Sequence, residues 1–195
     1  MAKPRHYIFL LAALVVFFGC GGIRFSHLSP EAQDFHPQSV AILDIGAGGY
    51  EEAREAVDRI VTGELTDKGW FQSVLSVQAV QAMFREKELL RKASEDYLAK
   101  LNAVNFSDPE LSRQISEQAR IDAFLLVNID YWYYTKEADR DVAKVGLGMR
   151  MIAARTGALI WKAGHHLSVD YRFSKPELKS VAADVVKQMV GVMPH

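Results

Sequence analysis

A short glycine-rich stretch offers the most familiar chemistry in this sequence. The segment VAILDIGAGGYEEAREAVDRIV, residues 40–61, runs from β-branched apolar residues through the glycines of positions 46–49 into an amphipathic helix. Nucleotide and S-adenosylmethionine sites are often built in this order, because glycines let a tight turn bring a ligand to the N-terminus of a helix. The segment is therefore a candidate cofactor loop, and its spacing can be tested against those motifs.

The spacing of these glycines fits neither motif. The dinucleotide motif G-x-G-x-x-G needs a third glycine where Glu51 stands, and the methyltransferase motif expects one at Tyr50. The next predicted strand, FQSVLSV, also ends without the acidic residue that would hold the ribose hydroxyls. We therefore expect a structural turn from sheet to helix, with Glu51 and Glu52 at the positive end of the helix dipole, and no cofactor.

Two clusters contain residue types that bind metal ions. His165 and His166 are adjacent, and in a strand their side chains would point to opposite faces, where they could not easily share one ion. Glu137, Asp139 and Asp141 lie between two predicted strands, but the glycine and the closing glutamate of a calcium loop are missing. We expect ordinary strand histidines and a charged hairpin tip, and no metal site.

No catalytic motif stands out in the sequence. There is no G-x-S-x-G, the one cysteine is Cys20, and the Ser, His and Asp residues show no diagnostic spacing. Paired carboxylates that meet only in the folded chain would leave no trace in the sequence, so an envelope hydrolase stays open as an alternative. We expect a protein that is not an enzyme.

The aromatic run Tyr131, Trp132, Tyr133 and Tyr134 is the strongest candidate for a binding surface. In a strand, Tyr131 and Tyr133 would share one face, and Trp132 and Tyr134 would share the other. Both faces can be filled only if helices or a partner cover each of them. Sheet packing is one interpretation and a protein-binding surface is the other, because Tyr and Trp are favoured anchors in interfaces.

The elements that would position these residues form an α/β pattern. Short apolar runs predict strands, and apolar residues that recur every three or four positions predict helices. The predicted order is β-α-β-α-α-β-β-β-α, with strands at 40–45, 70–77, 123–134, 142–154 and 158–171 and helices at 50–68, 77–104, 109–120 and 176–193, the second of these helices broken once at most. Two βα units ahead of a run of strands indicate a mixed β-sheet flanked by helices. Residues 39–195 are expected to form this single domain.

The N-terminus has the features of an exported lipoprotein. Two basic residues precede an unbroken apolar run at 8–18, and its eleven residues are too few to span a bilayer as a helix. Such a run is typical of a secretory signal peptide, here residues 1–19. Cys20 follows a glycine, and this junction resembles the bacterial lipoprotein processing site, where the cysteine is modified with lipid chains such as palmitate and becomes the mature N-terminus.

Residues 20–38 are predicted to be a flexible tether, because they contain glycine, proline and histidine but no sustained apolar period. A tether of this length would reach about 60 Å if fully extended. Gly21 stands where aspartate would signal retention at the inner membrane, which resembles the sorting signal for outer-membrane delivery in enteric bacteria. We expect a lipid-anchored protein at the periplasmic face of the outer membrane, with the inner membrane as the less favoured location.

Composition narrows the range of partners. The chain is 49% hydrophobic and has a formal net charge of −1, with no patch rich in lysine, arginine and aromatic residues. Nucleic-acid binding depends on a basic surplus that neutralises phosphates, so nucleic acid is not an expected partner. The expected partners are a membrane, through the lipid on Cys20, and envelope proteins or other copies of the chain.

Two stretches, RIDAFLLVNIDYWYY and TGALIW, are the most specific pieces of a wider pattern over residues 39–193. Through them the chain resembles the α/β lipoprotein superfamily that contains the curli secretion lipoprotein and the lipoprotein activators of penicillin-binding proteins, and whose fold is similar to the amino-terminal domain of the Tol-Pal translocation protein. It implies an anchor, an adaptor or a pore subunit with no shared catalytic residues. We expect an adaptor or accessory protein of the cell envelope. The alternative is an oligomeric subunit of an outer-membrane secretion channel.

Overall fold

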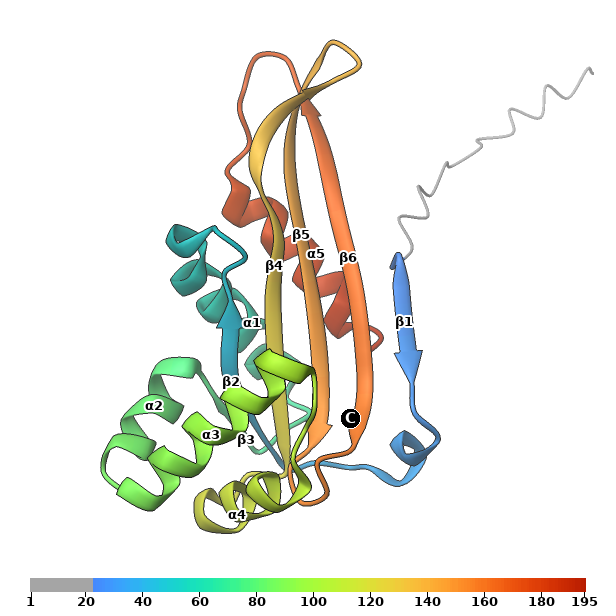
Figure 1. Ribbon diagram of the computed structural model, residues 1–195. Coiled ribbons are helices and arrows are strands. Elements are labelled where there is room, and N and C mark those ends of the chain that lie inside the picture. The colour runs from blue at the N-terminus through green and yellow to red at the C-terminus, as the bar shows by residue number, and fades with distance from the viewer. Residues whose placement is uncertain (1–22) are drawn as a thin grey trace, which may run out of the picture.

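The fold is organised around one six-stranded β-sheet (Figure 1). The computed structural model describes residues 23–195, so the predicted signal peptide and Cys20 lie outside the described residues. The strands stand side by side in the order β1-β6-β5-β4-β2-β3, in which β2 runs parallel to β3 and β4 and the other neighbours are antiparallel. Their bounds are β1 (Phe25–Leu28), β2 (Ser39–Gly46), β3 (Ser73–Leu75), β4 (Ala123–Glu137), β5 (Arg140–Ala153) and β6 (Leu159–Tyr171).

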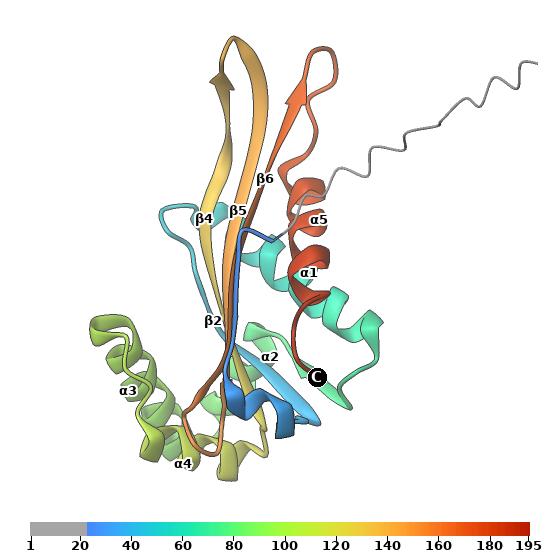
Figure 2. The same cartoon turned by 90° about the vertical axis from the view of Figure 1, so that its right-hand side faces the viewer.

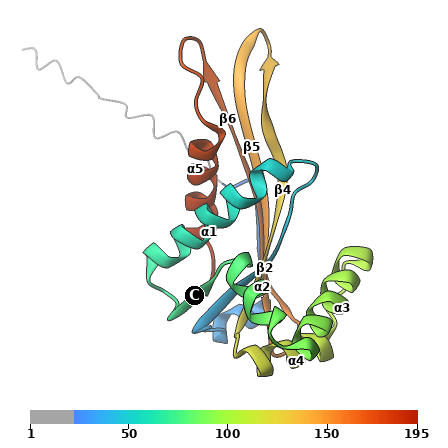
Figure 3. The same ribbon diagram turned by 90° about the vertical axis from the view of Figure 1, so that its left-hand side faces the viewer.

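Helices cover the two faces of the sheet unequally (Figures 2 and 3). Helices α1 and α5 lie on one face, whereas α2, α3 and α4 cover only one end of the other face, over β2 and the adjoining ends of β4 and β5. Between residues 23 and 195 no helix is both long enough and apolar enough to cross a bilayer. The bounds are α1 (Arg54–Lys68), α2 (Val77–Arg85), α3 (Glu88–Val104), α4 (Pro109–Ala119) and α5 (Leu178–Val190), with short 3-10 turns η1 (Pro30–Asp34) and η2 (Glu51–Ala53).

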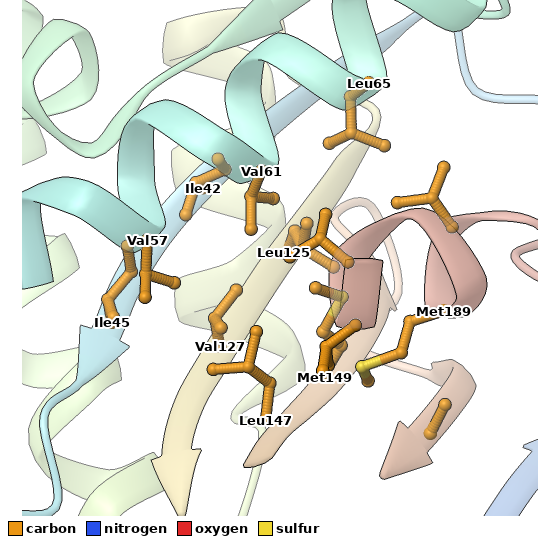
Figure 4. Packing of buried hydrophobic residues seen from close by; sticks show 14 of the residues in the cluster. Ile42, Ile45, Val57, Val61, Leu65, Leu125, Val127, Leu147, Met149 and Met189 are labelled. Atoms are coloured by element: carbon orange, nitrogen blue, oxygen red, sulfur yellow. The ribbon is translucent and has the colours of Figure 1, made fainter. Parts of the chain in front are cut away.

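The face under α1 and α5 holds the larger hydrophobic core (Figure 4). Helix α1 presents Val57, Val61 and Leu65 at helical spacing, and all three side chains are fully buried. They pack over alternate strand residues, among them Leu125 and Val127 of β4. Burial of a side chain of this size contributes about 1.5–3 kcal/mol relative to leaving it exposed, so these contacts hold α1 on the sheet.

The predicted fold class, a mixed sheet flanked by helices, is confirmed. The helix expected at 77–104 is broken once, before Glu88, into α2 and α3. Gly69 ends α1 in the left-handed conformation with φ of 65°, as glycine readily does. Asp108 begins α4 by accepting hydrogen bonds from backbone N–H groups of its first turn.

The folded domain begins earlier than the sequence predicts. Residues 25–28, expected to be tether, form β1 and pair with β6, and Ala32 of η1 is buried. The pairing is fixed by backbone contacts and by Trp161, whose Nε1 donates a hydrogen bond to Ser26 Oγ at 3.1 Å. All four β1 side chains are exposed, so the segment has no buried face and gives no apolar period for a sequence-based prediction to detect.

Candidate functional site

The upper part of the sheet in Figure 2 has one face without a helix. Strands β4, β5 and β6 continue past the layer formed by α2, α3 and α4, and no helix of residues 23–195 covers this continuation on that side. We call this surface the helix-free face. Alternation along paired strands places on it Phe25, Asn128, Tyr131, Tyr133, Lys144, Gly146, Gly148, Gly164 and His166.

Glycines have no side chain and so leave space on the helix-free face, where aromatic rings can lie across the strands. A Cβ built on Gly146 would stand 2.5 Å from Cδ2 of Tyr131, which means that the tyrosine ring occupies the space of the missing side chain. Phe25 lies in the same way beside Gly164, with its Cδ1 3.6 Å from a Cβ built there. A pocket of about 240 Å³ lies between Phe25 and Tyr131, above Gly164. The alternate glycines of β5 and β6 therefore shape a shallow aromatic surface.

The tyrosines of this face form a connected cluster. The ring centroids of Tyr131 and Tyr133 are 6.0 Å apart, and Tyr131 meets His166 edge-on at 5.6 Å. Tyr50, which comes from the loop beside β4, brings its ring to 6.3 Å from Tyr133. Lys144 Nζ lies 5.3 Å from the centroid of the Tyr131 ring, which favours a cation–π contact. Tyr131 is nevertheless 37% exposed, so the cluster is held in place by its own contacts and is still accessible to a partner.

Ion pairing and burial shift the pKa values of several titratable groups on the same face. Glu137 Oε1 accepts a hydrogen bond from Lys144 Nζ at 2.7 Å, and this contact raises the pKa of Lys144 and lowers the pKa of Glu137. Burial, with Arg24 and Lys144 nearby, lowers the pKa of His166, so its ring is neutral at pH 7. Burial also raises the pKa of Asp130, which makes no ion pair with any residue from 23 to 195. The face therefore combines aromatic rings with a paired cation and with an exposed carboxylate that makes no ion pair in the described chain.

The four aromatic residues predicted as a binding surface are divided between the two faces, as their alternation predicts. Tyr131 and Tyr133 lie on the helix-free face. Trp132 is only 8% exposed and packs in the larger core, on the face that α1 and α5 cover. Tyr134 lies on that side as well, where its hydroxyl donates a hydrogen bond to the Pro176 carbonyl at 2.8 Å. Trp132 and Tyr134 therefore have structural contacts, and the surface open to a partner is the one that carries Tyr131 and Tyr133.

The sequence pattern does not predict three further aromatic residues at the helix-free face, Phe25, Tyr50 and His166, as binding residues. Phe25 and Tyr50 reach the face from distant segments, and no local pattern places them beside β4 and β6. From the sequence, His166 is a candidate only for metal binding. The sequence signal for this surface is VGLGM in the predicted strand at 142–154, because glycines at alternate positions lie on one side of a strand and leave space there.

The candidate cofactor loop has a close backbone approach that requires glycine. Gly48 has φ of 59°, and a Cβ built on it would stand only 2.3 Å from the Ile129 carbonyl oxygen in β4. Gly49 also has a positive φ, of 99°. The Tyr50 N–H then donates to the Ala47 carbonyl at 2.9 Å and closes the turn. The glycines thus carry the chain past the edge of β4 toward α1, in agreement with the predicted structural turn.

The candidate metal residues do not converge. His165 is 5% exposed beneath the helices and has no hydrogen-bond partner for either ring nitrogen within the described chain, whereas His166 lies on the opposite face. Residues 23–195 contain no group of three His, Cys, Asp or Glu side chains close enough to hold an ion. Glu137, Asp139 and Asp141 form the charged tip of the β4–β5 hairpin, as predicted.

A second pocket, of about 330 Å³, lies where the α2–α3 layer meets the open part of the sheet. Leu43, Phe84 and Leu98 supply apolar walls, and the ion pair between Arg91 and Glu95 lies on the rim. Apolar walls with a charged rim suit a single apolar side chain of a protein partner. This pocket is formed by β2, α2 and α3 and is separate from the aromatic cluster, with which it shares no lining residue.

Comparison with known proteins identifies the fold and no family. No protein-family model matches the sequence, and no curated protein matches it. Among solved structures, the fold is similar to that of PelC from Paraburkholderia phytofirmans, a dodecamer, with a TM-score of 0.54 and 14% identity over 82% of this chain and 91% of that one. Lipoprotein GNA1162 from Neisseria meningitidis gives a TM-score of 0.52 with 12% identity over 80% of this chain and 100% of that one. The hypothetical protein CT253 from Chlamydia trachomatis gives 0.52 with 12% identity over 78% and 93%. The chain therefore has a bacterial lipoprotein-like fold.

Proposed function

We propose that this protein is a non-enzymatic lipoprotein of the bacterial cell envelope, anchored through Cys20 at the periplasmic face of the outer membrane, and that it acts as an adaptor or accessory protein by binding other envelope proteins. The observation that carries the proposal is the helix-free face, where Tyr131 and Tyr133 form an ordered and accessible cluster. The fold shared with a neisserial lipoprotein supports residence in the envelope.

The cluster has the physical properties of a binding hot spot. Tyrosine anchors at the centre of an interface often contribute about 2 kcal/mol or more to binding. Association normally costs about 0.5–1.5 kcal/mol for each flexible side chain that it orders. Here Tyr131 is already held by Gly146, His166 and Lys144, so less of that cost remains to be met on binding. A partner that covers this face would also complete the burial of the sheet.

The proposal can be tested by cross-linking in intact cells. A photoreactive phenylalanine analogue placed at Tyr133 should give one discrete adduct with an envelope protein. The matched control places the same analogue at Phe106, which is 53% exposed beside the α2–α4 layer, and should give no such adduct. Cys20→Ala should strongly reduce the adduct at position 133, because the chain then loses its lipid anchor. Equal labelling from both positions, or an unchanged adduct in Cys20→Ala, would contradict the proposal.

A second candidate function is that of an oligomeric subunit of an outer-membrane secretion channel. The observation that favours it is the likeness in fold, over 82% of this chain, to a protein that assembles as a dodecamer. The same cross-linking experiment separates the two functions. Adducts of the chain with itself, forming a ladder that stops at a fixed number of subunits, would favour the channel subunit over the adaptor.

A further inference from the structure

The edge of the sheet formed by β1 and β6 collects exposed apolar side chains. Phe25 and Leu28 are 48% and 53% exposed on β1, and Val169 is 37% exposed on β6. Phe173, directly after β6, is fully exposed. We call this surface, from residue 24 to 28 and along β6 to residue 173, the β1–β6 edge. Isolated apolar residues are normal on a protein surface, but four exposed ones along one edge of a sheet, on both of its faces, point to contact with an apolar phase or a partner.

The short segment between Cys20 and Ile23 places the lipid anchor close to the same edge. Ile23, which immediately precedes this edge, is partly buried and packs against the larger core. Only three residue steps separate it from Cys20, and such a segment spans at most about 11 Å. If Cys20 carries lipid, as the proposed function requires, the acyl chains begin within that distance of the folded domain. The bilayer surface therefore has to lie next to the β1–β6 edge and not at the far end of an extended tether of residues 20–38.

The charges of this edge suit an anionic lipid surface. Arg24, Lys162 and Arg172 lie along it, whereas the carboxylate of Asp170 is paired with Arg140. Lys162 Nζ is 5.4 Å from the centroid of the Phe25 ring, so a cation and an apolar ring share one position on the edge. Basic and aromatic side chains together bind the interfacial region of membranes that contain anionic phospholipids. Pairing of two copies of the chain at this edge would instead bring the same cations together.

Part of the β6 backbone at this edge has N–H and C=O groups that no neighbouring strand of the described chain pairs with. β1 pairs with β6 only at residues 161–164, so residues 165–171 of β6 have no neighbouring strand on that side within the described chain. Exposed edge strands are sites of unwanted pairing unless they are covered or charged. Phosphate groups and water of the lipid headgroup layer can accept hydrogen bonds from these N–H groups, which a purely apolar phase could not do.

We propose that the β1–β6 edge is a membrane-contacting surface that binds anionic phospholipid headgroups and places Phe25 in the interfacial layer. The inference rests on lipidation of Cys20, which belongs to the proposed function, and adds the orientation of the domain. The sheet then stands with its edge on the bilayer, and its two faces are directed along the membrane surface.

The test uses the mature lipidated chain in vesicles of phosphatidylethanolamine and phosphatidylglycerol. Cys20 is the one cysteine of the sequence, so once it is lipidated a cysteine introduced by His27→Cys on the edge can be labelled alone with a fluorophore. The control is Lys92→Cys, which is exposed on α3 at the other side of the sheet (Figure 1). Lipids with a nitroxide in the headgroup should quench the label at position 27 strongly and the label at position 92 weakly. Equal quenching of the two labels would overturn the inference.

Two further measurements separate the possible failures. Mass spectrometry of the mature chain shows whether Cys20 is lipidated. Absence of the lipid overturns the proposed anchor and this inference together, whereas a lipidated chain with an unquenched edge overturns this inference alone. In unlipidated Cys20→Ala protein, Phe25→Ser should weaken binding to the same vesicles about tenfold and Arg24→Glu at least about fivefold. Phe106→Ser, at a phenylalanine of similar exposure, should leave it unchanged, and an effect as large as that of Phe25→Ser would also overturn the inference.

Discussion

Substitution of the adjacent glycines Gly48 and Gly49 of the 46–49 turn by alanine should have very different effects on stability. Both have positive φ, so alanine at either position costs about 1–2 kcal/mol of backbone strain. At Gly49 no atom lies within 4 Å of an added Cβ, and strain is the whole expected cost. At Gly48 the added Cβ would stand 2.3 Å from the Ile129 carbonyl oxygen, and the backbone of β4 has to move. Overpacking of that kind costs about 1–3 kcal/mol in addition.

The free energy of unfolding measured in urea should therefore fall further for Gly48→Ala than for Gly49→Ala, by about 1–3 kcal/mol, at an unchanged m-value. A larger m-value would instead indicate that the substitution changes the unfolded ensemble. If the glycines instead served a ligand, Gly48→Ala would affect ligand binding and leave the ligand-free chain as stable as Gly49→Ala does. Equal losses for the two variants would refute the argument that close packing on β4 explains this turn.

Three further substitutions and conditions test other parts of the structure. Gly146→Ala should displace the Tyr131 ring, because the added methyl group would lie 2.5 Å from ring carbon Cδ2, and should reduce cross-linking of the proposed partner while circular dichroism stays native. Tyr134→Phe removes one hydrogen bond to backbone and should lower the unfolding free energy by about 0.5–1.5 kcal/mol, measured in urea, with partner cross-linking unchanged. His165 and His166 have pKa values lowered by burial, so the unfolded chain binds their protons first and stability should decline as the pH falls from 7 through 6.5. Replacement of both histidines by glutamine should remove this decline between pH 7 and 5.5, and a decline that persists would contradict the assignment.

The sequence contains enough information for the elements of the sheet but not for its first strand. The long strands and the helices are signalled by buried side chains that recur with a period of two or of three to four, as in Val57, Val61 and Leu65 of α1. β1 has no such signal, because its four residues are exposed and are held by backbone pairing with β6. A segment that gains its structure from hydrogen bonds to a distant strand is indistinguishable from a tether when only its own composition is considered.

The candidate site shows the same limit at the level of single residues. The alternation of Tyr131 and Trp132 across the sheet follows from strand geometry and could be predicted. Which of the two faces lacks helices depends on where α2, α3 and α4 pack, and that is decided by contacts between segments far apart in the sequence. The same is true of Tyr50, which reaches the cluster only because Gly48 lets the preceding loop pass close to β4.

The two proposed surfaces overlap at Phe25 and along β6, and this overlap constrains how they can work together. Phe25 lies on the β1–β6 edge, and its ring also forms one wall of the pocket beside Tyr131 on the helix-free face. If the β1–β6 edge rests on the bilayer, the helix-free face stands upright on the membrane and is directed along its surface. The part of that face nearest the edge then lies at the headgroup layer. A partner that covers Tyr131 and Tyr133 would then have to approach within the thin layer next to the membrane. Such geometry favours proteins that are themselves attached to or embedded in that membrane, because confinement to the same layer raises their effective concentration at the binding face.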